Sequence, residues 1–155
     1  MVHGARYIYA ALVWAFMAGL VVQVYLIGLG LFASSDYTKL HVTFGWILHL
    51  VPPFILLTAA AASAGRTLVI QTTALSITIF IVPILAAIRA DAPLAAAFHP
   101  VGAVLAFLLA IFVARGATRL LRSTDPETPT GLVGWVLVAL LVVIYLVLSL
   151  GGSAA

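Results

Sequence analysis

The sequence predicts an all-α polytopic membrane protein, in which an up-and-down four-helix transmembrane bundle is followed by a fifth, C-terminal transmembrane helix. Of the 155 residues, 65% are hydrophobic and only 7% are charged, whereas soluble domains have about 25% charged residues. The mean hydropathy is +1.29. Apolar runs of about 20 residues can each cross about 30 Å of hydrocarbon, so the lipid bilayer is the first expected partner.

Five such runs follow one another, near residues 7–33, 40–62, 68–88, 93–114 and 131–150. Short connections join the first four, so neighbouring helices must run antiparallel and pack side by side. Small residues, among them the alanines in 59–62, let helices approach closely in lipid.

The fifth run is set apart by a longer polar segment that contains prolines. We therefore divide the chain into a four-helix bundle at 1–115, a cytoplasmic linker at 116–130, and a fifth helix with a short tail at 131–155. Apart from Trp135, Tyr145 and Ser149, the last helix offers almost only aliphatic surface. It is expected to face lipid or to dock on another subunit, which leaves homo- and hetero-oligomers open.

Basic residues predict the orientation in the membrane, because cytoplasmic loops carry more Lys and Arg. With the amino terminus inside, the inner loops would hold Arg6, Arg66, Arg115, Arg119 and Arg122, against Lys39 and Arg89 outside. We expect a bacterial inner-membrane protein with a cytoplasmic amino terminus and an external carboxyl terminus. The net charge of +3 reflects this bias and does not indicate nucleic-acid binding.

The absence of cysteine excludes disulfides, iron–sulfur clusters and thiolate metal sites. Polar groups within the hydrocarbon indicate function, and three histidines lie there: His41, His49 and His99. His41 and His49 share a helix face but are about 12 Å apart along the axis, too far to chelate one ion. A compact zinc site is therefore not expected.

Counting residues from the inner boundary places His49 and His99 each about 24 Å outward. Two level imidazoles on separate helices provide the two axial ligands of a haem b, and a bundle interior provides an apolar slot. We therefore expect His49 and His99 to be iron ligands. Gly45, one turn from His49, leaves room for a flat ring, and Arg89 is a candidate partner for haem propionates.

Prolines bear on this site in two ways. Pro52 and Pro53 deprive the carbonyls of Leu48 and His49 of their usual donors, so the helix should bend just inward of His49. Residues before proline avoid helical angles, so His99, which precedes Pro100, could instead lie at the mouth of the pocket. In that case His41 competes with His49 as its partner.

The chain resembles an uncharacterised family of small bacterial integral membrane proteins. The shared residues are Gln23 with the Gly-x-Gly of Gly28 and Gly30, the His-x3-Gly-x3-His pattern of His41, Gly45 and His49, and the His-Pro pair that begins at His99. The resemblance covers roughly residues 7–115 and implies no activity. The histidines are also similar in style to those of four-helix membrane b-type cytochromes, which often bind two haems with four histidines; three histidines do not provide for two such haems.

These residues favour a single-haem electron carrier or haem-dependent subunit near the outer membrane face, which exchanges electrons with quinol or an external partner. The alternative is a structural or pigment-binding subunit of a larger respiratory or photosynthetic complex, with bacteriochlorophyll or no cofactor. Histidines that only hydrogen-bond between helices also remain open. No complete catalytic constellation is found, so enzymatic activity is left undecided.

Overall fold

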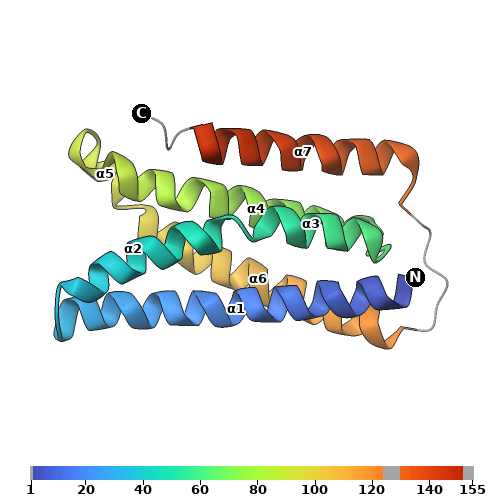
Figure 1. Ribbon diagram of the computed structural model, residues 1–155, viewed down its shortest axis with the longest axis horizontal. Helices are drawn as coiled ribbons and strands as arrows, with labels where there is room; N and C mark the ends of the chain where they lie inside the picture. Colours follow the sequence, from blue (N-terminus) through green and yellow to red (C-terminus); the bar gives the residue numbers. More distant parts are fainter. Residues whose placement is uncertain (1, 124–129, 152–155) are drawn as a thin grey trace.

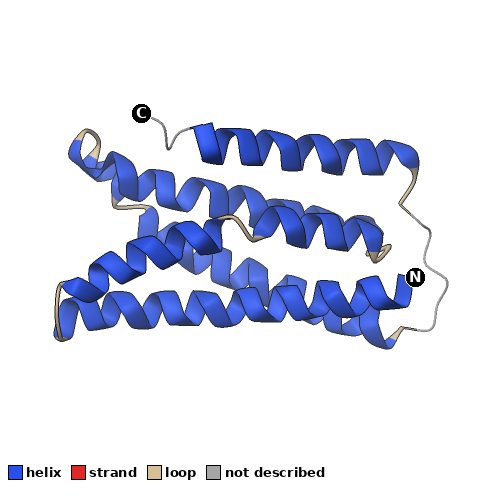
Figure 2. Ribbon diagram, in the orientation of Figure 1, coloured by secondary structure: helices blue, strands red, loops and turns tan. Residues whose placement is uncertain are grey.

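The computed structural model describes residues 2–123 and 130–151, and all regular structure within these ranges is helical (Figures 1 and 2). The elements are α1 (Val2–Phe32), α2 (Asp36–His49), α3 (Pro52–Ala61), α4 (Gly65–Ala87), the 3-10 turn η1 (Ile88–Ala90), α5 (Pro93–Ala96), α6 (His99–Arg122) and α7 (Leu132–Gly151). Within the described ranges, four stretches are long and apolar enough to cross a membrane, namely Val2–Phe32, Asp36–Ala61, Gly65–Ala90 and Pro93–Arg122. The predicted fold class is confirmed.

The first four spans form a closed ring. α1 packs against α2 and α3 on one side and against α6 on the other, and α4 packs against α3 and α6. The second span and α6 are therefore diagonal neighbours across the bundle, as are α1 and α4. This arrangement lets side chains of α2 and α6 meet at the centre, between the backbones of α1 and α4.

The second span is broken where its prolines fall, as expected. α2 ends at His49 and α3 begins at Pro52. Because Pro52 has no N–H, the Leu48 carbonyl accepts instead from the N–H of Val51, at 3.1 Å. The break lets α2 run obliquely to α1 (Figure 1), which changes which of its side chains reach the bundle centre.

The fourth span is also divided, into α5 and α6, and α6 begins at His99 itself. Its other end runs to Arg122, so residues 116–122 continue the helix into the segment expected as a linker. Residues 124–129 of that linker lie outside the described residues.

Arg6 is buried, and its Nη1 donates a 3.0 Å hydrogen bond to the carbonyl of Ser123, beside the end of α6. A cation is favoured at this end of the helix by the helix dipole.

Most of the large side chains that are fully buried lie in the half of the bundle that contains the start of α1. Tyr9, Val13 and Phe16 of α1 meet Ile55, Leu75 and a stripe of alanines on α6. The Tyr9 hydroxyl also hydrogen-bonds that of Thr72 at 2.8 Å. The small side chains of the alanine stripe let α6 approach its neighbours closely, and the other half of the bundle is left less completely filled.

α7 lies along the outside of the ring and packs on α3 (Figure 1). Val138 and Val142 join Leu56 and Ala60 in a separate apolar cluster. At the start of α7, the Thr130 hydroxyl donates to the carbonyl of Ala60 at 2.9 Å. The fifth helix is therefore docked within its own chain, while the rest of its surface is exposed.

Candidate functional site

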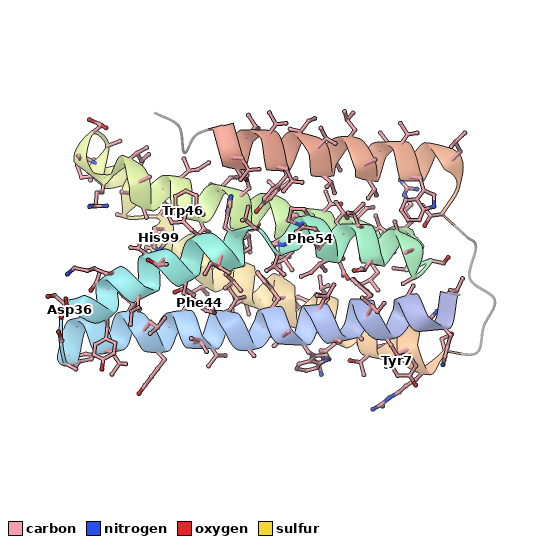
Figure 3. All side chains as sticks on the ribbon, in the orientation of Figure 1. Tyr7, Asp36, Phe44, Trp46, Phe54 and His99 are labelled. Carbon is pink, nitrogen blue, oxygen red and sulfur yellow. The ribbon has the colours of Figure 1, made fainter. Side chains whose placement is uncertain are left out.

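A cavity of about 290 Å³ opens between the four spans. It borders the apolar core, with which it shares Leu48, Ile79 and Ala106, and it extends toward the end of the bundle where α2 and α6 begin. In Figure 3, His99, Trp46 and Phe44 are seen in the same half as Asp36, whereas Tyr7 is at the opposite end. The lining residues are mostly apolar; the polar ones are Gln23, His41, Trp46, His49, Arg89 and His99. All three histidines expected inside the membrane thus border one cavity.

His41 and His99 are the histidines whose rings meet. Their ring centroids are 6.4 Å apart and the planes are inclined at 81°. His41 comes from the second turn of α2, and His99 is the first residue of α6. The rings therefore reach the cavity from diagonal helices, near the ends of both.

Each of these two rings is oriented by a backbone carbonyl of a neighbouring helix, α1 for His41 and α4 for His99. His41 Nδ1 donates to the carbonyl of Gln23 on α1 at 3.0 Å, and His99 Nδ1 donates to that of Val82 on α4 at 2.8 Å. A carbonyl can only accept, so Nδ1 carries the proton and Nε2 carries the lone pair. Neither Nε2 has a hydrogen-bond partner within residues 2–123 and 130–151.

His49 is oriented in the same way, but its lone pair is occupied. Its Nδ1 donates to the carbonyl of Ile79 at 3.1 Å, and its Nε2 accepts from the Ser149 hydroxyl at 2.9 Å. The Tyr145 hydroxyl donates to the His49 carbonyl at 2.6 Å. We call these four residues, His49, Ile79, Tyr145 and Ser149, the His49 junction.

Prolines explain why two carbonyls are free to join the His49 junction. In a continuous helix the carbonyl of residue i accepts from the N–H of residue i+4. Pro53 removes the donor for His49, and Pro83 removes the donor for Ile79. Buried carbonyls in a membrane must find other donors, and here Tyr145 and the ring of His49 provide them.

The ring that lies beside His99 in the structure is that of His41, the competing candidate, and not that of His49. The expected level was nearly right: His49 and His99 bind carbonyls of Ile79 and Val82, three residues or about 4.5 Å apart along α4. However, His49 is only 3% exposed and its ring stacks near Phe80 and Tyr145. The oblique path of α2 brings His41 beside His99.

Gly45 lines the cavity, but the space beside it is taken by a side chain. A Cβ at this position would come within 2.5 Å of Nε2 of Gln23, so Gly45 admits the Gln23 amide. The amide oxygen, Oε1, is buried without a hydrogen-bond partner in the described part of the chain. Gln23 was not among the residues expected to form the site, although it belongs to the shared pattern of the resemblance.

Arg89 lines the cavity and is exposed at its rim. It is the one charged side chain among the described residues that border the cavity. Lys39, a second cation at the same end of the bundle, forms a 2.9 Å ion pair with Asp36, and both side chains are largely exposed. Arg89 is therefore the cation available to an anionic group in the cavity.

Tyr145 and Ser149 are the residues whose part in the site was not foreseen. With Val138 and Val142 they occupy positions i, i+4, i+7 and i+11 of α7, which is one helical face. Two side-chain hydroxyls, on the same helix face as two valines, indicate from the sequence that this face packs against polar groups. Their partner could not be inferred, because His49 was expected to face the cofactor.

The fold and the site define a helical membrane protein with a histidine-lined cavity. The chain is similar to a family of unknown function (DUF6220), which matches residues 23–90, less than half of the chain. That stretch contains Gln23, His41, Gly45 and His49 and ends before His99. No curated protein and no solved structure matches the chain.

Proposed function

We propose that this chain is a b-type cytochrome of the membrane that binds a single haem b between His41 and His99. The observation that carries the proposal is the pair of Nε2 lone pairs: both rings are fixed through Nδ1 to backbone carbonyls and present Nε2 without a protein partner among the described residues. Histidines that bind metals commonly donate their second nitrogen in this way.

The spacing of the rings is compatible with an ion between them. With metal–nitrogen bonds of about 2.0–2.1 Å, two imidazoles on opposite sides of one ion have ring centres roughly 6–6.5 Å apart. The centroids of His41 and His99 are 6.4 Å apart. Aromatic pairs in direct contact also have centroids about 4.5–7 Å apart. The free lone pairs, and not the distance, therefore distinguish a pair of metal ligands from a simple ring contact.

The number of ligands favours haem over a bare ion. Within the described residues, no group of three or more His, Cys, Asp or Glu side chains is placed to hold a metal. A structural zinc ion needs four protein ligands and a catalytic one needs three. A porphyrin supplies four nitrogens itself, so two histidines complete the coordination of its iron.

The cavity suits an apolar ring with an anionic edge. Its lining is mostly aliphatic, with Arg89 at the rim, where a propionate could pair with it. A volume of about 290 Å³ is just below the range of small-molecule sites, about 300–1,000 Å³, so a porphyrin would fill it and extend toward the lipid. Trp46, which lines the cavity and is 47% exposed, borders that opening.

Haem bound here would supply one-electron transfer. The chain itself orients the two ligands and surrounds the iron with apolar side chains, and no proton-transfer group other than histidine lines the cavity within the described residues. Electron transfer with quinol or with another subunit of a membrane complex is therefore the activity that we propose. Catalysis of a further reaction is not part of the proposal.

We propose that this site lies toward the outer face of a bacterial inner membrane, with the amino terminus in the cytoplasm, because Arg66 and the arginines at the end of α6 lie at the opposite end of the bundle from Lys39 and Arg89. Since the chain has no cysteine, single cysteines introduced at Tyr37 and at Arg66 report their side of the membrane. Labelling of Tyr37→Cys from outside and of Arg66→Cys only after permeabilisation is expected, and the reverse result overturns the orientation.

An absorption spectrum of the full chain, purified in mild detergent from cells supplied with haem precursor, tests the proposed cofactor. We expect a Soret band and sharp α and β bands on reduction. His41→Ala and His99→Ala should each abolish the six-coordinate low-spin spectrum, whereas His3→Ala, at an exposed position near the amino end, should leave it unchanged. A colourless wild-type protein would exclude the haem, and a far-red spectrum would establish the alternative, a magnesium-pigment carrier.

A further inference from the structure

The three membrane histidines share one arrangement and differ at one atom. Each donates Nδ1 to a carbonyl on a neighbouring helix. Only His49 has its Nε2 lone pair occupied, and the donor is Ser149 of α7. His49 nevertheless borders the same cavity as His41 and His99. Without Ser149, the Nε2 lone pair of His49 would also lack the partner that now occupies it.

His49 lies close enough to the other two histidines to compete with them as a ligand of the proposed haem. It binds the α4 carbonyl of Ile79, less than one turn from that of Val82, which orients His99. A rotation of the His49 ring toward the cavity would therefore present its Nε2 at nearly the level of His99. In the observed state that rotation would break the hydrogen bonds to both Ile79 and Ser149.

α7 holds Ser149 in place through contacts at both of its ends. Thr130 donates to the Ala60 carbonyl at the start of the helix. Val138 and Val142 pack on α3 in the middle, and Tyr145 donates to the carbonyl of His49 one turn before Ser149. Because the hydroxyl of Ser149 is carried on a docked helix, it reaches His49 only when α7 is seated.

We propose that Ser149 is a positioning residue that withholds His49 from the cofactor, so that His41 and His99 are the two axial ligands. This inference rests on the proposed haem. It gives the fifth helix a role in choosing the ligands: the seated helix occupies the third histidine. The single-haem site is thereby restricted to one pair of ligands although three histidines border the cavity.

Restoring a second axial ligand to a variant that has lost one tests this inference. The full-length protein with His41→Ala loses one ligand, and its haem should become high-spin. Adding Ser149→Ala should release His49, whose ring-rotated population is expected to rise by about tenfold on loss of one hydrogen bond. The double variant should recover a six-coordinate low-spin fraction, measured by the Soret and α bands and by electron paramagnetic resonance.

A matched pair of variants controls for side-chain size. Ser149→Thr keeps the hydroxyl, and Ser149→Val has nearly the same shape without it. In the His41→Ala background, Val should restore low-spin haem and Thr should not. A merely structural role for Ser149 would disturb stability in both variants and would not restore a ligand.

Added imidazole shows whether the pocket is folded, because it should fill the vacated position in His41→Ala. If the His41→Ala, Ser149→Ala protein accepts imidazole but stays high-spin without it, and Ser149→Val does the same, the inference is overturned while the proposed haem stands. If the wild-type protein binds no haem, both are overturned. If Thr and Val restore low-spin haem equally, the hydroxyl is not what restrains His49, and the inference again fails.

Discussion

The Tyr145 hydroxyl donates a 2.6 Å hydrogen bond to the carbonyl of His49, 96 residues away in the sequence. That carbonyl is the one that Pro53 leaves without its helical donor. Tyr145 is 8% exposed, so neither group has ready access to water. One side chain of the fifth helix thus completes the backbone hydrogen bonding at the break in the second span.

This relationship predicts a coupled effect of two substitutions. Tyr145→Phe should lower the free energy of unfolding by about 1–3 kcal/mol, because it leaves a buried carbonyl unpaired. In a Pro53→Ala background, the restored N–H can pair with His49, and the cost of Tyr145→Phe should fall. Equilibrium unfolding in mixed detergent micelles measures both costs.

Pro52→Ala is the control for this pair of substitutions. Pro52 cannot donate to the carbonyl of Leu48, but that carbonyl already accepts a hydrogen bond from Val51. The cost of Tyr145→Phe should be the same in that background as in the wild type. An equal cost in the Pro53→Ala background would show that the Tyr145 hydroxyl does not substitute for the missing donor.

Gln23 provides a second prediction, because its Oε1 is buried without a partner among the described residues. An unpaired polar atom in an apolar environment costs about 1–3 kcal/mol. We expect Gln23→Leu to leave the ligand-free protein as stable or to stabilise it by about 1 kcal/mol, while weakening retention of the cofactor. Thermal unfolding with and without haem separates the two effects.

The matched control is Thr72→Val, which removes a buried hydroxyl that does have partners, namely Tyr9 and the carbonyl of Leu68. It should destabilise the protein with and without haem alike. A destabilisation of ligand-free Gln23→Leu as large as that of Thr72→Val would mean that the amide is structural and not reserved for a ligand.

Gly45 and Gln23 should show a size-dependent interaction. A Cβ at residue 45 would be 2.5 Å from Nε2 of Gln23, so Gly45→Ala must displace this amide, which lines the cavity. We expect Gly45→Ala to reduce haem retention. Adding Gln23→Ala should restore the room and part of the retention, because the amide itself is also lost. Haem transfer to apomyoglobin measures retention; additive losses in the double variant would refute the direct contact.

Arg89 and Lys39 are expected to differ although both lie at the same end of the bundle. Arg89→Gln should weaken haem retention by about threefold to tenfold, because a charge-assisted hydrogen bond at an exposed rim is only partly screened. Lys39→Gln removes an exposed ion pair with Asp36 and should change retention little. Equal effects of the two substitutions, measured by the same transfer assay, would argue against a propionate at Arg89.

The sequence by itself determined the class of fold. Hydrophobic runs of transmembrane length, short connections and a proline pair fixed the spans, the antiparallel order and the break between His49 and Pro52. These features are local, since each follows from the cost of exposing backbone or charge to lipid. The residues that border the cavity were also foreseen in part, because histidines are too costly in hydrocarbon to lie there without a partner.

Only the tertiary structure decided which histidines meet. Residue counting along a straight axis gave the level of His49 to within one turn, but it could not include the tilt of α2 that follows from the break. Nor could it show that Ser149 and Tyr145, a hundred residues further on, occupy the His49 junction. Depth in a membrane is set by local composition, whereas the direction of a side chain is set by how whole helices cross, and that depends on contacts distant in sequence.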